Sequence, residues 1–266
     1  MIWARMVTVF ALMSAGSAAA DAMKLAVTTS FQNSGLSEIL LPEIAADTGI
    51  DVQLIVVGTG QAIRLGEAGD VDAILVHGRK AEDAFIAAGF GTHRREIMFN
   101  DFVLVGPDND PAGVGDAENT TEALRTIAFG NVAFTSRGDD SGTHQRELSL
   151  WTAAGIKPSG TWYRELGAGM GATLNTAVAM QAYVLSDRAS WLNFGNKGGM
   201  GIVFQDDPAL FNQYTYIPVN PERHPHVEFA LAERLEEWLV SDKGQKIIGA
   251  YTIDGQTLFT PNAAEN

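Results

Sequence analysis

The chain has 266 residues, with 18 Lys and Arg against 32 Asp and Glu, a formal net charge of −14 and no cysteine. The hydrophobic fraction of 46% is that of a packed globular protein and excludes an intrinsically disordered chain. The acidic balance excludes a duplex nucleic-acid binder, because such proteins need a basic surface that replaces counterions. Without cysteine, neither a disulfide framework nor a thiolate metal site can form.

The first twenty residues are typical of a secretory signal peptide. Arg5 is their only charged residue, residues 6–13 form a short apolar run, and residues 18–20 are the alanines of a cleavage site. The run is too short to cross a bilayer, which takes roughly 20 apolar residues. We therefore expect residues 1–20 to be removed and the mature protein to be periplasmic. We expect no membrane anchor, because no cysteine is present to accept a lipid.

Short strands and helices alternate in the first part of the mature chain. Strands are predicted at 24–28, 52–57 and 71–76, and helices from Ser34 or Ser37 to 46, at 61–67 and at 80–88. The run 52–57 has no strict polar alternation, which predicts a strand buried on both faces. The β-α-β-α-β-α order predicts a parallel sheet with helices on both sides.

A second α/β pattern follows an extended segment at 97–107, which predicts a crossing strand broken at Asn100 and Asp101. Beyond it the sequence predicts these elements: helices at 121–129, 142–154 and 173–185, strands at 132–135, 190–194 and 202–204, a return strand at 214–219, and helices at 227–240 and 242–251. The glutamates of the penultimate helix are predicted to be solvated: Glu228, Glu233, Glu236 and Glu237.

This organisation predicts an α/β protein of two lobes with a hinge and a ligand cleft between them. Lobe 1 comprises residues 21–101 with about 213–266, and lobe 2 comprises residues 102–212. Ligands of open α/β sheets bind at the carboxyl ends of the strands, so the residues that follow the strands are the candidates for ligand contacts.

Small hydroxyl residues or glycines lie between a strand and a helix in four segments: 28–35, 58–60, 135–143 and 169–173. Each segment offers free backbone N–H groups at a helix N-terminus, where the helix dipole favours an anion. One such segment alone is an ordinary helix cap. Four of them, two from each lobe, would surround one small anion if the lobes face each other.

Arg137 is the most specific candidate for an oxyanion contact within these segments. Its guanidinium is a rigid fork of donors that suits an oxyanion. The alternative is a structural ion pair with Asp139, Asp140 or Glu147. Both interpretations hold together if a carboxylate orients the arginine.

The same segments carry a family resemblance. Five motifs resemble, in order, the tungstate-binding extracytoplasmic proteins of ABC importers: KLAVTTSFQNSGLSEILLPEI, VVGTGQAIRLGEAGDVDAILVH, RREIMFNDFVLVGPDNDPAG, FTSRGDDSGTHQRELSLW and GAGMGATLNTAVAMQAYVLSDRASWL. The resemblance runs from about residue 24 to 192 and implies the type II periplasmic-binding-protein fold. It also implies a tungstate or molybdate oxyanion in the cleft, a membrane permease as partner, a monomer, and neither cofactor nor metal.

The resemblance further implies the residues of the pocket. The ligand-binding set is Thr29, Ser30, Thr59, Ser136, Arg137 and Thr173. Supporting or alternative oxyanion contacts are Asp139, Ser141, Gly142, Thr143, Gly171 and Ala172. Whether Asp139 contacts the ligand or only orients Arg137 stays open at this point.

Two alternatives remain. Residues 137–143 also resemble the R-x-D-x-S-G-T stretch of phosphate-binding proteins, in which a protonated phosphate needs an acceptor such as Asp139. A secreted phosphoester hydrolase would use Ser141, His144 and Asp140, although the G-x-S-x-G elbow is absent. We expect a binding protein rather than an enzyme, and surface histidines rather than a metal site at His224 and His226.

Overall fold

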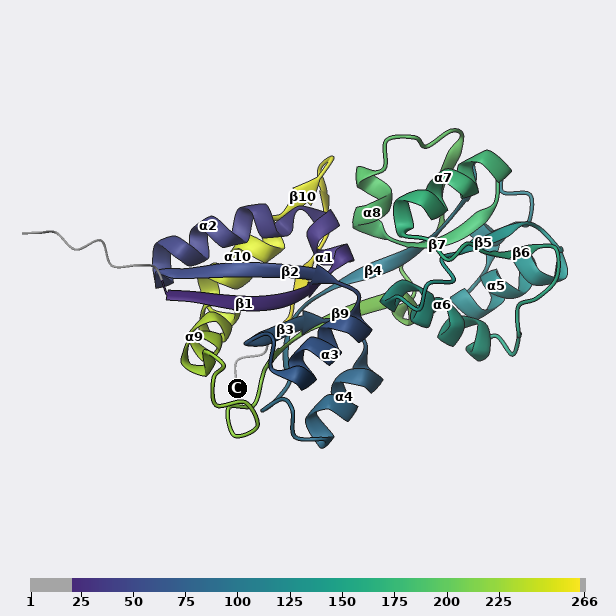
Figure 1. Ribbon diagram of the computed structural model, residues 1–266. Coiled ribbons are helices and arrows are strands. Elements are labelled where there is room, and N and C mark those ends of the chain that lie inside the picture. Colours follow the sequence, from purple (N-terminus) through teal and green to yellow (C-terminus); the bar gives the residue numbers. More distant parts are fainter. Residues whose placement is uncertain (1–20, 264–266) are drawn as a thin grey trace, which may run out of the picture.

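The computed structural model describes residues 21–263 and shows two α/β parts that share a large mixed sheet (Figure 1). The strand order is β2-β1-β3-β9-β4-β7-β5-β6, with β8 and β12 also pairing with β4. The predicted two-lobe α/β fold is thereby confirmed. The predicted signal peptide lies outside the described residues. Among the residues described, no helix is both long and apolar enough to cross a membrane.

The first part is built on three parallel strands, as predicted: β1 (Asp21–Thr28), β2 (Ile50–Val57) and β3 (Ala73–Val76). Two antiparallel strands extend it, β9 (Phe211–Pro218) and β4 (Arg95–Pro107). Its helices are α1 (Thr29–Ser34), α2 (Leu36–Thr48), α3 (Thr59–Ala68), α4 (Arg79–Ala87), α9 (Phe229–Val240) and α10 (Asp242–Ala250).

Helices cover both faces of this sheet, and strand β1 contributes apolar side chains to the core on each face. Leu25 and Val27 pack in the cluster that includes α2, α9 and α10. Ala26 points to the other face, where Ile63 of α3 and Phe85 of α4 lie. Because successive side chains of a strand point to opposite faces, β1 packs against one layer of helices on each side of the sheet.

The second part holds the parallel strands β5 (Phe134–Ser136), β6 (Tyr163–Glu165) and β7 (Tyr183–Asp187). Its other elements are β8 (Met200–Phe204), α5 (Thr120–Phe129), α6 (Gly142–Ala153), α7 (Met170–Met180) and α8 (Arg188–Asn193). Buried Phe134, Trp151 and Tyr163 form its aromatic centre. Short pieces complete the chain: turns of 3₁₀ helix at Val114–Asp116 and Pro208–Leu210, and β10 (Thr252–Ile253), β11 (Gln256–Thr257) and β12 (Thr260–Pro261).

Strand β4 runs through both parts, as Figure 1 shows. It pairs with β9 up to Asp101 and with β7 from Phe102 onward. The predicted break at Asn100 and Asp101 is wrong, because the strand is continuous there. The polar side chains are accommodated without a turn: Asn100 accepts a hydrogen bond from Asn212 of β9 at 2.8 Å, and Asp101 is paired with Arg188.

Two predicted elements near the junction are wrong. The helix predicted at 173–185 ends at Met180, because Gln181 adopts a left-handed conformation with φ of 50°, and the chain continues as strand β7. The strand predicted at 190–194 is helix α8. Its N-cap Asp187 accepts a hydrogen bond from the backbone N–H of Ser190 at 2.9 Å.

Three smaller predictions also fail. The helix predicted from Ser34 or Ser37 is present as α2, but its N-cap is left-handed Gly35 rather than a serine, and the short helix α1, which Thr28 caps, precedes it. Strand β2 lies at the sheet edge and is only partly buried. Glu236 is buried rather than solvated, because it accepts hydrogen bonds from His93 and Arg95.

Candidate functional site

A cavity of about 280 Å³ lies where α1 of the first part faces α7 and α8 of the second. It is lined by residues of both parts: Thr29, Ser30, Asn33, Arg137, Gly169, Met170, Gly171, Ala172, Asp187 and Ser190. The two parts also touch directly, since Asn193 Nδ2 donates a hydrogen bond to the carbonyl of Asn33 at 2.9 Å. The size of the cavity suits one small ligand.

On the α1 side, Ser30 is only 8% exposed and its hydroxyl has three polar neighbours. Its Oγ lies 3.0 Å from Thr28 Oγ1, 3.0 Å from His77 Nε2 and 2.9 Å from the Tyr214 hydroxyl. Burial, assisted by the charge of Arg137, lowers the pKa of His77 to about 4, so its ring is neutral at pH 7. If neutral His77 and Tyr214 both donate to Ser30, the Ser30 proton can be given either to Thr28 Oγ1 or to a ligand.

On the opposite side, Arg137 is 9% exposed and follows strand β5. Its Nε and Nη2 donate to Asp139 Oδ2 at 3.1 and 2.5 Å, so its Nη1 lies outside that pair. Burial opposes ionisation of Asp139, but hydrogen bonds from Ser141 and Arg137 outweigh it and hold the pKa of Asp139 below its usual value. An ionised Asp139 therefore orients Arg137, and Asp139 itself does not line the cavity.

The first turn of α7 forms the third wall. Residues 169–172 line the cavity, and the N-cap Gly169 has no side chain with which to satisfy the free amides. The first N–H groups of a helix lack partners inside the helix, and its dipole favours negative charge there. Arg137, Ser30 and the first turn of α7 therefore place hydrogen-bond donors around the same cavity.

Asp187 and Ser190 close the cavity. Asp187 is 1% exposed, and burial raises the pKa of its carboxyl. The Ser190 hydroxyl oxygen is buried and lacks a hydrogen-bond partner among the residues described. The cavity thus contains one cation, one buried carboxyl group and free donors.

The structure brings five of the predicted site residues to this cavity: Thr29, Ser30, Arg137, Gly171 and Ala172. Three others lie behind it. Thr59 Oγ1 donates to the carbonyl of His77 at 3.1 Å, and Thr173 Oγ1 donates to that of Gly169 at 3.1 Å. Ser136 is fully buried, and its Oγ completes no hydrogen bond among the residues described.

The remaining predicted residues, Ser141, Gly142 and Thr143, begin α6 and do not line the cavity. Gly142 nevertheless lies directly against the first part, because a Cβ on it would be 2.9 Å from His77 Nδ1 and closer still to His77 Cε1. Sequence reasoning did not find five residues that line the cavity or support it: Asn33, His77, Asp187, Ser190 and Tyr214.

The geometry does not support a hydrolase at Ser141. The Ser141 hydroxyl caps α6 by accepting from the backbone N–H of His144, and His144 Nδ1 accepts from the backbone N–H of Asp140 at 3.1 Å. The imidazole therefore does not activate the serine hydroxyl. Within residues 21–263, no cluster of three His, Asp or Glu side chains could hold a metal ion.

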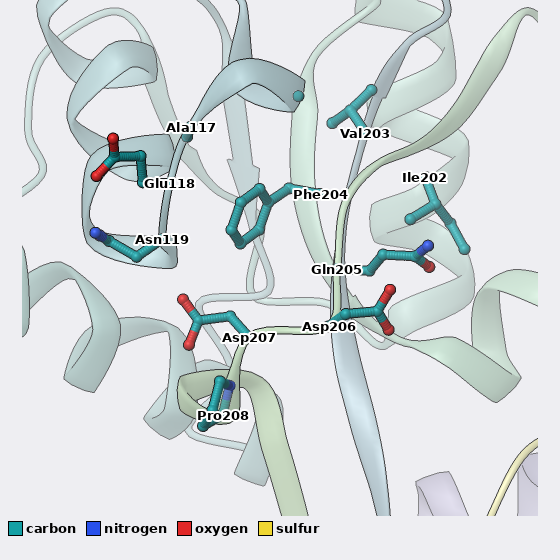
Figure 2. A pocket seen from close by; sticks show the side chains of 11 residues that line it. Ala117, Glu118, Asn119, Ile202, Val203, Phe204, Gln205, Asp206, Asp207 and Pro208 are labelled. Atoms are coloured by element: carbon teal, nitrogen blue, oxygen red, sulfur yellow. The ribbon is translucent and has the colours of Figure 1, made fainter.

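A larger cavity of about 540 Å³ lies on the second part, between the end of β8 and the start of α5 (Figure 2). The carboxylates of Glu118, Asp206 and Asp207 lie around it. No cationic side chain lines it in the part of the chain that the structure describes, so it is unsuited to an anion. The smaller cavity at Arg137 is the candidate site.

Two α/β parts joined by long strands, with a polar cavity where they face each other, define the class of periplasmic binding proteins. A family model described as a PBP superfamily domain matches residues 14–243. The chain therefore belongs to the PBP superfamily.

Sequence similarity to named proteins places the chain in a narrower family within this superfamily. The chain is 46% identical to the tungstate-binding protein TupA of Peptoclostridium acidaminophilum, covering 91% of this chain and 86% of that protein. It is 33% identical to TupA of Campylobacter jejuni, with 88% of each chain covered. Within the superfamily, the chain belongs to the family of these TupA proteins.

Solved structures agree with this placement. A tungstate-binding TupA from Desulfovibrio alaskensis has a TM-score of 0.83 and 43% identity, covering 92% of this chain and all of that one. The structure titled as the tungstate ABC transporter from Geobacter sulfurreducens has a TM-score of 0.81 and 48% identity, covering 88% of this chain and all of that one.

Proposed function

We propose that this protein is the periplasmic solute-binding protein of an ABC importer, and that it captures tungstate or molybdate and delivers it to the membrane permease. One observation carries the proposal: buried Arg137, Ser30 and the first turn of α7 converge on one cavity of about 280 Å³. Tungstate and molybdate are fully deprotonated at neutral pH, so a set of donors is what they require. The relatives named as tungstate-binding proteins support this choice.

The ligand contacts that we propose are Thr29, Ser30 and Arg137, with the backbone amides of Gly171 and Ala172. Thr59, Ser136 and Thr173 support these contacts from behind. Asp139 acts on the ligand only through Arg137, since both guanidinium hydrogen bonds and the backbone N–H of Ser141 already occupy its carboxylate.

We further propose that the lobes are residues 21–101 with the chain from about 213 onward, and residues 102–212, and that they close on the ligand. The change of β4 pairing from β9 to β7 between Asp101 and Phe102 supports this division. Closure is stabilised only to the extent that the oxyanion binds the closed form more tightly than the open one. We propose a monomer without catalytic activity, exported after removal of residues 1–20.

A panel of anions tests the proposed function by thermal unfolding. Tungstate and molybdate are expected to raise the unfolding temperature, because a ligand at 100 times its dissociation constant adds about 2.7 kcal/mol to the free energy of unfolding. Sulfate, phosphate and arsenate at equal concentration are expected to add much less. A shift with phosphate alone, or with none of the five anions, contradicts the proposal.

A further inference from the structure

The cavity contains the carboxyl group of Asp187, which a binding site for an anion does not require. Asp187 lines it together with Arg137 and the free amides of α7. One of its carboxylate oxygens, Oδ1, accepts from the backbone N–H of Ser190 at 2.9 Å. Asp187 forms no ion pair in the part of the chain that the structure describes, whereas the neighbouring Arg188 is paired with Asp101.

The charged and titratable groups around Asp187 come from three elements. Burial raises the pKa of Asp187 while Arg137, after β5, opposes it, and burial together with the charge of Asp187 raises the pKa of Tyr214 on β9. His77, after β3, packs against Tyr214 with ring centroids 5.0 Å apart. Arg137 is the only cation among these, and it already neutralises Asp139. A second buried negative charge beside this cavity is therefore poorly compensated.

A dianion entering the cavity makes that imbalance larger. It places two negative charges near a desolvated carboxylate, and like charges at short range disfavour ionisation. The neutral carboxyl, by contrast, offers an O–H donor to a fully deprotonated oxyanion. We propose that the protein takes up one proton on the Asp187 carboxyl when tungstate or molybdate binds, so that binding of the oxyanion and of the proton are coupled. This inference rests on the proposed function.

The sign of the coupling follows from linkage. If the complex holds one more proton than the separated protein and anion, the affinity rises as the pH falls. The change is at most about tenfold per pH unit, reached where Asp187 is ionised in the free protein and protonated in the complex. The affinity does not depend on pH in the range where Asp187 has the same protonation state in the free protein and in the complex.

Calorimetric titration with sodium tungstate tests the coupling directly. Titrations from pH 6 to 9, each in two buffers that differ in ionisation enthalpy, count the protons taken up. The wild-type protein is expected to take up as much as one proton per tungstate in part of this range. Asp187→Asn is expected to bind tungstate with a proton count near zero and an affinity that is nearly independent of pH. Asparagine keeps the oxygen that caps α8, so the fold is preserved.

Two further variants test whether Asp187 is the group that takes up the proton. Asp207→Asn changes another capping aspartate of the second part, away from the Arg137 cavity, and is expected to leave affinity and proton count at wild-type values. His77→Gln removes the titratable imidazole near the cavity. This variant is expected to weaken binding through Ser30 but to retain the proton uptake.

The outcomes are distinct. A wild-type proton count of zero throughout the range, uptake that persists in Asp187→Asn, or uptake that disappears in His77→Gln overturns the coupling at Asp187 while leaving tungstate binding intact. An absence of tungstate binding to the wild-type protein overturns the proposed function instead.

Discussion

Replacing Arg137 with alanine is expected to weaken tungstate binding between about tenfold and a hundredfold. Among the described residues 21–263, this guanidinium is the only cationic group that lines the cavity, and a hydrogen bond to a charged group contributes about 1.5–3 kcal/mol. Each 1.4 kcal/mol is a factor of about ten in affinity. The loss also leaves Asp139 without its partner, and the whole molecule already carries a formal charge of −14. Calorimetric titration measures the change.

Two variants serve as controls for Arg137. Arg137→Lys keeps the charge but loses the planar fork, so its affinity is expected to fall between those of the wild-type and alanine proteins. Arg234→Ala removes the same charge from an exposed pair with Asp21 and is expected to bind normally. An Arg137→Ala protein with wild-type affinity would show that the ligand lies elsewhere.

Replacing Gly142 with alanine is expected to weaken tungstate binding by a comparable amount. The added Cβ would lie 2.9 Å from His77 Nδ1 and closer still to Cε1, so the two parts could no longer approach as closely. His77 is held by Ser30 and packed against Tyr214, so its displacement would disturb the Ser30 hydroxyl. Overpacking a well-fitted contact costs about 1–3 kcal/mol, or roughly five- to 150-fold in affinity.

The Gly142→Ala effect should fall mainly on binding, because the lobes of the free protein, which we propose to close on the ligand, can move apart and relieve the overlap with His77. Alanine is a better helix former than glycine, so α6 itself is not weakened, and the unfolding temperature without ligand is expected to stay close to that of the wild type. Gly60→Ala, in the first turn of α3, is the matched control because its Cβ meets only Arg64 at an ordinary 3.7 Å. Equal affinities of Gly142→Ala and wild type would show that the His77–Gly142 contact is absent from the bound form.

The first part of the fold could be predicted because its strands are short, apolar and separated by clear helix signals. The segment from Thr173 to Asp187 could not. Its Ala- and Met-rich start is helical, and the buried run of β7 that follows cannot be told from a buried helix by periodicity alone. The error then hid α8, and with it the capping role of Asp187.

The candidate site could be predicted in part for a related reason. Arg137 and the α7 start are marked by local sequence, since glycines, hydroxyls and an arginine lie at strand ends. His77 and Tyr214 are separated from Ser30 by 47 and 184 residues, so only the fold brings them to the Ser30 hydroxyl. Thr59, Ser136 and Thr173 lie at the right helix starts and strand ends, but their side chains point to backbone carbonyls or into the second part.

The anomalous scattering of tungsten in crystals grown with tungstate is the most direct test of the oxyanion site. One strong peak is expected in the cavity between α1 and α7, with an oxygen of the anion within hydrogen-bond distance of Arg137. A peak at the acidic cavity of Glu118, Asp206 and Asp207, or no peak at either position, would contradict the proposed oxyanion site.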